Sequence, residues 1–317
     1  MLNTVRNTDS ADPLVAAIAS VLRSLFADGW HLESVRRETR KAAHLCAKKY
    51  DLFGCQSKYL LFIASESQPQ NVLKSFRSEA SRQQRFPLTI LYDNGKTCES
   101  SQTYTLNDFL EKLGGSIDTN RIMRPDIANL LKTIGHNQPY DSLIGEPQDL
   151  LEEYTKDCLQ YILGQRARRF GSDRLFESLP DGVAFGRNKL SIYFDAKAYS
   201  DGYKLKSDDI LRFASYVDDY NKRYAKYLGP IFAFVVTSGT FKMTARSMNN
   251  KAGMLYAKCM TQLTFVESEE LGCIVNMLMQ KQRLLTTLDW ASILSHRVLE
   301  MKLVQKDLER VRKDGLI

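Results

Sequence analysis

The stretch 190–198 restricts the fold of this chain more than any other, because its side chains alternate between apolar and polar. Every second residue is apolar: Leu190, Ile192, Phe194, Ala196 and Ala198. This period of two predicts a β-strand with one face toward a core. Asp195 and Lys197 then share the opposite face, away from the core, and project together. Such a pair is either a surface ion pair that contributes little to stability or part of a site.

A turn signal, Pro180-Asp181-Gly182, precedes this strand, because proline fixes φ and glycine frees it. A hairpin across residues 186–189 would fold Asp181 back beside Asp195. Two neighbouring carboxylates repel each other unless a divalent cation lies between them, and their oxygens suit Mg2+ or Mn2+. Lys197 would then face the phosphate and the attacking water, which it could orient or deprotonate.

The spacing of Asp181, Asp195 and Lys197 resembles the PD-(D/E)xK nuclease motif. The wider strings are more specific. PDG at 180–182, DAKAYSDGY at 195–203, FVV at 234–236 and SGTFK at 238–242 resemble the FokI-type cleavage domain of type IIS restriction endonucleases. The similarity covers about residues 150–290. It implies an α/β fold with a restriction-endonuclease-like core, a central mixed sheet flanked by helices, preceded by a smaller α/β domain.

The resemblance also implies a chemistry. Asp181 and Asp195, with the backbone carbonyl of Ala196, would hold Mg2+ (or Mn2+) against a DNA phosphate, and Lys197 would complete the catalytic set. The implied activity is Mg2+-dependent endonuclease cleavage of double-stranded DNA, of the restriction or phage-defence type. The alternatives are a catalytically silent DNA-binding or sensing module with the same fold, and a nuclease of repair or transposition. RNA stays open as a substrate, because nothing in the motif reads the 2′-hydroxyl.

Further residues are candidates for the same site. Nucleases of this class often place a Glu on the preceding helix near the metal, which makes Glu152 or Glu153 candidates on a helix expected over 149–164. The alternative is that both are solvated charges on a helix face. The candidates for contacts with DNA phosphates are basic residues on either side of the strand pair: Arg166, Arg168, Arg169, Arg174, Lys242 and Arg246.

One such site cuts one strand, so a double-strand break needs two protomers or two successive visits. In the resembling domain an Asp and an Arg pair across a two-fold interface, and the matching positions here are Asp208 and Arg212. These residues are also spaced i, i+4 on a helix expected after Ser207, where they could pair within one chain. We expect a homodimer, at least during cleavage.

Breaker residues divide the chain into an N-terminal α/β domain (1–115), a connector (116–147) and the nuclease domain with C-terminal helices (148–317). The N-terminal patterns predict helix, strand, helix, strand and helix over residues 13–28, 59–64, 69–85, 87–92 and 105–113. Basic residues clustered over 36–49 are either a solvated helical face or a surface for the DNA backbone. Asp51 and Glu66-Ser67-Gln68 imitate the nuclease pattern with Gln in place of Lys. An inactive relative of the nuclease core, used in recognition or sensing, therefore competes here with an unrelated α/β domain.

Charge and composition limit the function further. The net charge is +7, and the Lys and Arg excess is 18 over 17 in residues 1–150 but 26 over 20 in the rest, so the positive charge accompanies the proposed site. The six cysteines lie far apart without the spacing of zinc ligands. No apolar run is long enough for a membrane span, and the first residues lack a signal pattern. We expect a cytoplasmic protein that does not enter membranes, and the resemblance implies a prokaryotic source.

Overall fold

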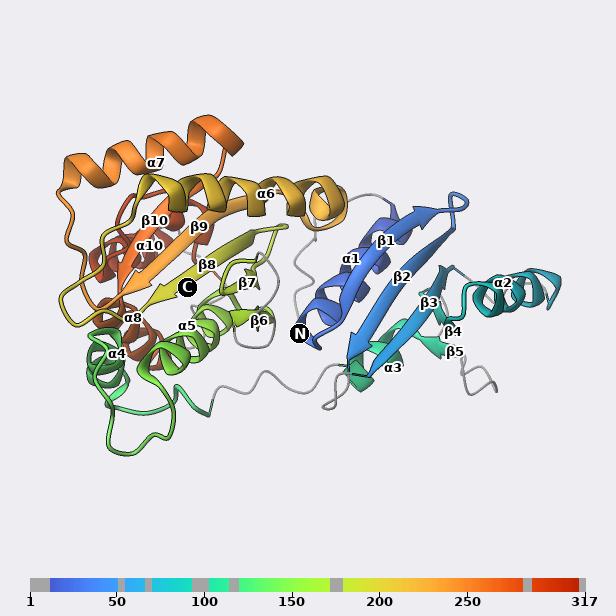
Figure 1. The fold of residues 1–317 in the computed structure, drawn as a ribbon, viewed down its shortest axis with the longest axis horizontal. Helices are drawn as coiled ribbons and strands as arrows, with labels where there is room; N and C mark the ends of the chain where they lie inside the picture. Colours follow the sequence, from blue (N-terminus) through green and yellow to red (C-terminus); the bar gives the residue numbers. More distant parts are fainter. Residues whose placement is uncertain are drawn as a thin grey trace. The chain divides into compact units, whose positions relative to one another are not determined.

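The computed structural model describes residues 12–50, 55–65, 70–92, 103–113, 120–171, 179–281 and 287–313. The chain forms two compact units, Met1–Ser116 and Ile117–Ile317, which we call the N-terminal and the C-terminal unit. Each is built around a mixed five-stranded sheet flanked by helices (Figure 1). The α/β fold class expected from the sequence is therefore observed. Among the described residues, no helix is both long enough and apolar enough to cross a membrane.

The sheet of the N-terminal unit has the strand order β1-β2-β3-β4-β5. Its strands are β1 (His31–Arg37), β2 (Ala42–Tyr50), β3 (Gln56–Ala64), β4 (Phe86–Leu91) and β5 (Thr103–Thr105). The first three are antiparallel, and β4 and β5 continue the sheet in parallel with β3. The helices are α1 (Pro13–Ala27), α2 (Gln70–Arg82) and α3 (Leu106–Leu113).

The basic segment 36–49 is not part of a helix. It belongs to the β1–β2 hairpin, so the interpretation as a helical face is wrong. Along β2 the fully buried residues recur at every second position, at Ala43, Leu45 and Ala47, which is the period of a strand. The polar and charged residues between them mask this pattern in the sequence.

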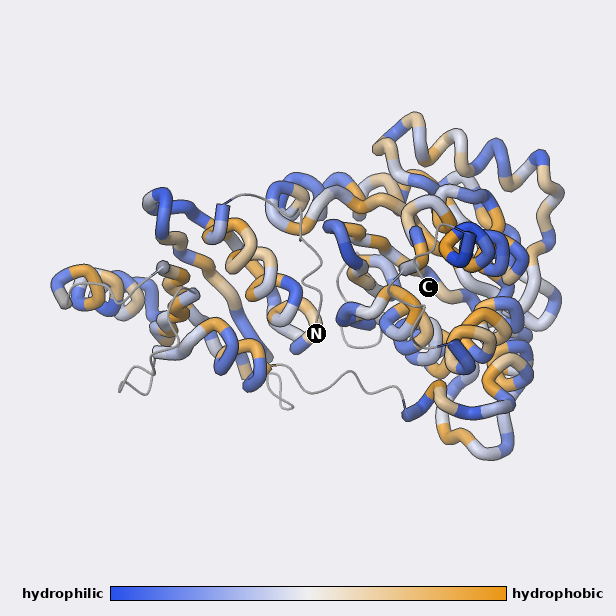
Figure 2. Tube along the Cα trace, turned by 180° about the vertical axis from the view of Figure 1, so that it is seen from behind, coloured by the Kyte–Doolittle hydropathy of each residue, from blue (hydrophilic) through white to orange (hydrophobic). Residues whose placement is uncertain are grey.

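Two helices of the N-terminal unit pack on opposite faces of its sheet. The Asp12 carboxylate caps α1 by accepting a hydrogen bond from Leu14 N, and α1 contacts β1, β2 and β3. On the other face, Phe62 and Leu60 of β3 form a small core with Phe76 of α2. The alternating colours of α2, at the far left of Figure 2, show its amphipathic character.

The sheet of the C-terminal unit has the order β10-β9-β8-β7-β6. Its strands are β6 (Ala167–Arg169), β7 (Gly182–Phe185), β8 (Ser191–Lys197), β9 (Ile231–Ser238) and β10 (Gln262–Glu267). The helices are α4 (Ile127–Gly135), α5 (Pro147–Leu163), α6 (Ser207–Leu228), α7 (Ala245–Cys259), α8 (Ser268–Met279), α9 (Trp290–Leu294) and α10 (Met301–Lys313). In Figure 1, α6 and α7 lie on one side of this sheet, and α4, α5 and α8 lie on the other.

The predicted hairpin is confirmed, since β7 and β8 pair antiparallel and Gly186 N donates to Leu190 O at 2.7 Å. Asn188 and Lys189 both have positive φ, as a two-residue hairpin turn requires. β9 lies between β8 and β10 and is parallel to both. It is buried on both faces, which explains its unbroken apolar run.

The expectation that β8 buries only one face is wrong. Its Phe194 face packs in the main core with α4, α5 and α8. The other face lies under α6, where Tyr193 packs edge-on against Tyr220 and Phe213 stacks on Phe234 of β9. Asp195 therefore lies in a buried position, with 4% of its surface exposed.

The region predicted as a connector contains α4, which packs tightly on α8. A Cβ on Gly272 would come within 2.5 Å of the Ala128 backbone, so only glycine allows this approach. The carbonyl of Gly135, at the end of α4, accepts hydrogen bonds from Tyr199 N at 3.1 Å and Gly239 N at 3.2 Å. These donors lie just after β8 and β9, so α4 fixes the backbone at the ends of both strands.

Candidate active site

Three side chains meet where β8 ends and β7 begins. Lys197 Nζ lies 3.1 Å from Asp181 Oδ2 and 3.1 Å from Asp195 Oδ2. Asp181 Oδ2 also accepts a hydrogen bond from Ala196 N at 2.8 Å. The hairpin therefore brings together the three residues that the sequence pattern singled out. Because each contact comes from a strand or its first flanking residue, the arrangement is held by the sheet itself.

The backbone on either side restrains the same residues. Phe170 N, just after β6, donates to Asp181 O at 2.6 Å. The Ser238 hydroxyl of β9 donates to Lys197 O at 2.7 Å. Neighbouring strands thus hold both the turn that carries Asp181 and the end of β8.

A third carboxylate, Glu152 of α5, approaches the cluster from the opposite side of the sheet. It is buried, and burial followed by the charge of Asp181 raises its pKa. The same two causes, burial first, raise the pKa of Asp195. Burial alone would lower the pKa of Lys197, but the charges of Asp195 and Asp181 outweigh it and raise that pKa. Lys197 is therefore a firmly protonated ammonium, and it faces more negative charge than it can neutralise.

Gln148, in the first turn of α5, links this helix to β8. Its Nε2 donates to Ala196 O at 2.6 Å and to Glu152 Oε1 at 2.9 Å, while its Oε1 accepts from Ala198 N at 2.8 Å. The side-chain amide thus pairs with the strand as another backbone amide would. It fixes both the Ala196 carbonyl and Glu152, two of the predicted metal ligands.

The oxygens of this site fit a divalent cation in type. Among the described residues, no three His, Cys, Asp or Glu side chains are close enough to hold a metal ion by themselves. Mg2+ does not require three, since it usually takes one or two carboxylates together with water and phosphate oxygens. Glu152 Oε2 is buried and makes no hydrogen bond with a described residue, and an excess of buried negative charge surrounds Lys197. A hard cation would give Glu152 Oε2 a partner and would offset the negative charge around Lys197.

The two glutamate candidates have different surroundings. Glu152 faces the cluster, whereas Glu153 forms ion pairs with Arg121 and, at 3.4 Å, with Arg169. Of the two, Glu152 is the one in position to join the site. Gly171 makes room for it, because a Cβ there would lie 2.0 Å from Glu152 Oε2.

The arginine candidates for phosphate contacts near β6 differ in their burial and in their contacts. Arg168 is 8% exposed, and its guanidinium lies 5.3 Å from the centre of the Phe170 ring, so it is a packed residue. Arg169 pairs with Glu153 and reaches the Asp149 carbonyl. Arg166 is half-buried, and Arg174 lies outside the described residues. Of the three described arginines around β6, Arg166 and Arg169 are thus half-buried and Arg168 is buried.

Lys242 and Arg246 lie beyond β9, at the same edge of the sheet as the ends of β8 and β9. Lys242 is exposed and lies 3.7 Å from Asp201 Oδ2. Arg246 is exposed in the first turn of α7. Tyr203 N donates to Thr240 O and Lys242 N to Tyr203 O, which ties the loop after β8 to the loop after β9.

The predicted pairing of Asp208 with Arg212 inside one helix is wrong. Arg212 pairs instead with Asp209, one residue further along α6, at 2.8 Å. Asp209 also accepts from Lys206 N at 2.9 Å and from the Tyr203 hydroxyl at 3.1 Å, so it caps the helix. Asp208 and Arg212 are both exposed, which leaves them accessible to a second protomer.

Gln148 is the site residue that sequence reasoning missed. Its spacing of four from Glu152 on one helix was a usable signal, because residues i and i+4 share a face. The link to β8, however, joins residues 48 and 50 positions apart, and no local pattern reports such a contact.

Residues 142–294 match the family described as FokI, cleavage domain. The chain is also similar to the structure of restriction endonuclease FokI, with 19% identity and a TM-score of 0.40 over 51% of this chain and 29% of that one. Against restriction endonuclease FokI bound to DNA, the identity is 19% and the TM-score 0.43, over 62% of this chain and 36% of that one. The chain thus spans little more than a third of those structures at most. No curated protein matched. The region expected from the resemblance lies within the match, and this part of the C-terminal unit is a FokI-like nuclease domain.

Proposed function

We propose that the chain is a Mg2+-dependent endonuclease that hydrolyses phosphodiester bonds in double-stranded DNA. The observation that carries the proposal is the Lys197 ammonium held 3.1 Å from both Asp181 and Asp195, within a FokI-like nuclease domain. The setting we propose is restriction or phage defence inside a prokaryotic cell. Mn2+ would serve in place of Mg2+, because both accept hard oxygen ligands.

The site residues would have two roles, which are to bind the cation and to orient the phosphate and the attacking water. Asp181, Asp195, Glu152 and the Ala196 carbonyl would hold the cation, which would supply Lewis-acid stabilisation of charge on the phosphate. Gln148 keeps Glu152 and the Ala196 carbonyl in place through its three hydrogen bonds. Lys197, being protonated, donates hydrogen bonds to the phosphate and orients the attacking water. A role as general base is less suited to it, because its acidic neighbours raise its pKa.

DNA would approach the edge of the sheet where β8 and β9 end. Exposed Lys242 and Arg246 lie at this edge, and Arg166 and Arg169 lie near β6. Together they offer cationic contacts to phosphates on both sides of the acids. Two protomers would meet through Asp208 and Arg212 on α6, so that each site cuts one strand.

Two substitutions test the proposal. Asp195→Asn and Lys197→Ala are expected to lower plasmid nicking in Mg2+ by at least about a thousandfold, because each removes a group acting on the reacting phosphate. Asp141→Asn and Lys281→Ala make the same charge changes at exposed positions of the unit and are expected to leave nicking unchanged. Circular dichroism melts establish that all four variants fold.

Wild-type nicking rates in both site variants would refute the site. A wild-type protein that binds plasmid but leaves it intact in both Mg2+ and EDTA would instead identify a catalytically silent binding module. Sequencing the ends of digested DNA then distinguishes a fixed recognition site from the unspecific cuts of a repair or transposition enzyme.

A further inference from the structure

The sheet of the N-terminal unit repeats that of the C-terminal unit strand for strand. In each, the first three strands are antiparallel and the fourth and fifth run parallel to the third. In each, the spatial order of the strands is the order in which they occur in the chain. The sequence α1-β1-β2-β3-α2-β4 therefore corresponds to α5-β6-β7-β8-α6-β9.

The helices follow the same plan. The helix before the first strand, α1 or α5, packs on the first three strands and touches the helix after the last strand, α3 or α8. The helix after the third strand, α2 or α6, covers the other face. The repeat thus includes both layers around the sheet, and topology alone makes the N-terminal unit a second copy of the nuclease core.

Among the described residues of the N-terminal unit, the acids of the site have no counterpart at the matching positions; Asp51 and Glu66-Ser67-Gln68, which imitate the motif in the sequence, lie outside the described residues. In the C-terminal unit, the ladder of β7 and β8 begins with Gly182 opposite Phe194, flanked by Asp181 and Asp195. In the N-terminal unit, the ladder of β2 and β3 begins with Ala42 opposite Ala64, flanked by Lys41 and Ser65. No acidic residue occurs in α1, the helix that corresponds to the one carrying Glu152. A lysine and a hydroxyl therefore stand where the other unit has carboxylates, which turns a place for a cation into a place for an anion.

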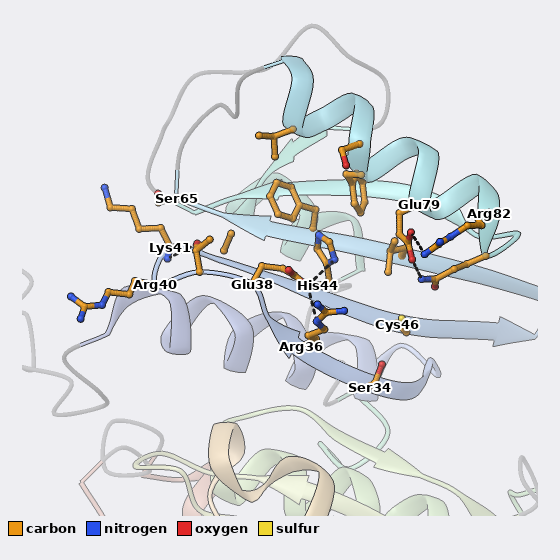
Figure 3. Close-up of a pocket in the computed structure, with 18 residues that line it drawn as sticks. Ser34, Arg36, Glu38, Arg40, Lys41, His44, Cys46, Ser65, Glu79 and Arg82 are labelled. Carbon is orange, nitrogen blue, oxygen red and sulfur yellow. Dashed lines mark hydrogen bonds and ion pairs between the residues drawn. The ribbon is translucent and has the colours of Figure 1, made fainter.

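A groove of about 1100 Å³ opens at this end of the N-terminal sheet, between α2 and the strands β1 to β3 (Figure 3). Four basic and two acidic side chains line it. The acids are already paired: Glu38 with Arg36 at 3.1 Å, and Glu79 with Arg82. Arg40 and Lys41 extend from the β1–β2 turn and have no acidic partner among the described residues. They give one end of the groove a positive charge that no described acidic side chain pairs with.

The same end holds a buried hydroxyl that has no hydrogen-bond partner in the described part of the chain. Ser65 is 2% exposed and lines the groove, and its Oγ makes no hydrogen bond with any described residue. A buried polar group without a partner costs free energy, so such groups commonly mark a place where a ligand binds. A phosphate oxygen would satisfy this hydroxyl while Arg40 and Lys41 neutralise its charge.

Aromatic side chains form part of the groove as well. Its floor includes Phe62 and Phe76, stacked with ring centres 5.3 Å apart, and the His44 ring lies 5.1 Å from Phe62. Burial lowers the pKa of His44, although Glu38 opposes the shift, and His44 Nδ1 lies 3.4 Å from Glu38 Oε1, which leaves Nε2 as the nitrogen for a ligand. A neutral ring over an apolar floor suits a planar heterocycle with polar edges.

We propose that the N-terminal unit is a non-cleaving copy of the nuclease core, and that its groove binds a phosphate attached to an unpaired nucleobase. The phosphate lies against Arg40, Lys41 and Ser65, and the base lies against His44. A free nucleotide and the unpaired end of a nucleic acid both offer this chemistry. Duplex DNA does not, because its bases are stacked inside the helix and cannot reach the groove floor. The proposal does not depend on whether the C-terminal unit cleaves DNA.

Binding by the full chain in EDTA tests the groove without cleavage. The probes are AMP and ATP by calorimetry, and a fluorescein-labelled single-stranded 12-mer and its duplex by fluorescence anisotropy. We expect Arg40→Ala/Lys41→Ala to weaken the binding of the probe about tenfold or more, because charge-assisted hydrogen bonds are lost. The matched control is Lys74→Ala/Arg77→Ala, which removes two exposed cations of α2 that do not line the groove. It is expected to change binding less than about twofold.

Ser65→Ala separates binding from folding. Removing an unpartnered buried hydroxyl leaves the melting temperature unchanged or higher, while binding weakens by several-fold. Nucleotide binding without 12-mer binding identifies a free nucleotide, and 12-mer binding that AMP does not displace identifies a strand end. The proposal is overturned if none of the probes binds, if only the duplex binds, or if both double variants weaken binding equally.

Discussion

The two units share a fold plan but differ where their second and third strands meet. In the C-terminal unit this end carries Asp181 and Asp195 around Lys197, whereas in the N-terminal unit it carries Lys41 and Ser65 beside a groove. Both sheets are nevertheless held by buried apolar residues along their strands. The comparison teaches that the apolar pattern specifies the sheet and that a few polar residues at its end specify the chemistry.

The helix on the second face differs as well. α6 has 22 residues and carries a row of buried aromatic residues along β8 and β9. α2 has 13 residues and packs mainly on β3 and β4, with Phe76 also reaching His44 of β2, and a groove remains between α2 and the rest of this face. A long helix thus closes the face in one unit, and a short helix leaves a groove in the other.

The largest expected effects come from the aromatic residue that anchors each helix. Phe76→Ala and Phe213→Ala each remove a buried ring, stacked on Phe62 and on Phe234 respectively. Each is expected to lower the free energy of unfolding of its own unit by about 3–5 kcal/mol. Hydrogen exchange followed by mass spectrometry reports the two units separately. Equal loss of protection in both units after either substitution would contradict their description as two compact units.

The next effect concerns Gln148, for which the N-terminal unit has no equivalent. Gln148→Leu leaves Ala198 N and Ala196 O without partners and is expected to cost about 2–3 kcal/mol in urea denaturation. Gln160→Leu is the control, because Gln160 is another glutamine of α5 whose side chain accepts from a backbone N–H, that of Ala167, away from the acids. If Gln148 positions the acids, its variant loses far more plasmid nicking than the control at saturating Mg2+. Equal losses of nicking would reduce Gln148 to a structural role.

A smaller effect is expected from substitutions that test α6 as the contact between two protomers. Asp208→Ala/Arg212→Ala is expected to lower the ratio of linear to nicked plasmid about tenfold, which corresponds to about 1.4 kcal/mol. The control, Asp218→Ala/Lys222→Ala, removes an exposed ion pair further along the same helix. A change in the control but not in the first variant would place the interface elsewhere on α6.

The smallest effect is a pH dependence that only the C-terminal unit should show. Burial and the charge of Asp181 raise the pKa of Glu152 to about 7. A carboxyl with a raised folded-state pKa is neutral in both states well below its unfolded value near 4.5. The unfolded state ionises first, so the free energy of unfolding falls as the pH rises from about 4.5 and levels off above about 7. Glu152→Gln in EDTA is therefore expected to match wild type at pH 4 and to be more stable by about 1 kcal/mol at pH 8. A constant difference in melting temperature across this range would show that Glu152 is not under electrostatic strain.

The parts of the fold that the sequence predicted are those with a regular local pattern. The alternation over 190–198 and the turn before it located β8, the β7–β8 hairpin and the meeting of Asp181 with Lys197. The apolar run at Ile231–Ser238 located a central strand. In these places the residues that decide the structure are neighbours in the chain, so their spacing carries the information.

The features that the sequence did not predict have a common physical cause. The β1–β2 hairpin was not recognised because a register shift between Leu32 and Ser34 interrupts its pairing and charges occupy its exposed face. Arg168 is a packed residue because its guanidinium lies over the Phe170 ring. Gln148 is a site residue because its side chain donates a hydrogen bond to Ala196 O of β8. Contacts between segments that are distant in the chain leave no regular residue spacing from which they could be predicted.

The carbonyl of Gly135 has a practical consequence for protein engineering. A fragment excised at the boundaries of the family match, 142–294, would discard α4 and with it the acceptor shared by Tyr199 N and Gly239 N. It would also strip Leu130, Leu131 and Ile134 from the main core, together with Val304 and Leu308 of α10. A fragment that keeps its core should therefore begin upstream of Ile122 and extend through α10.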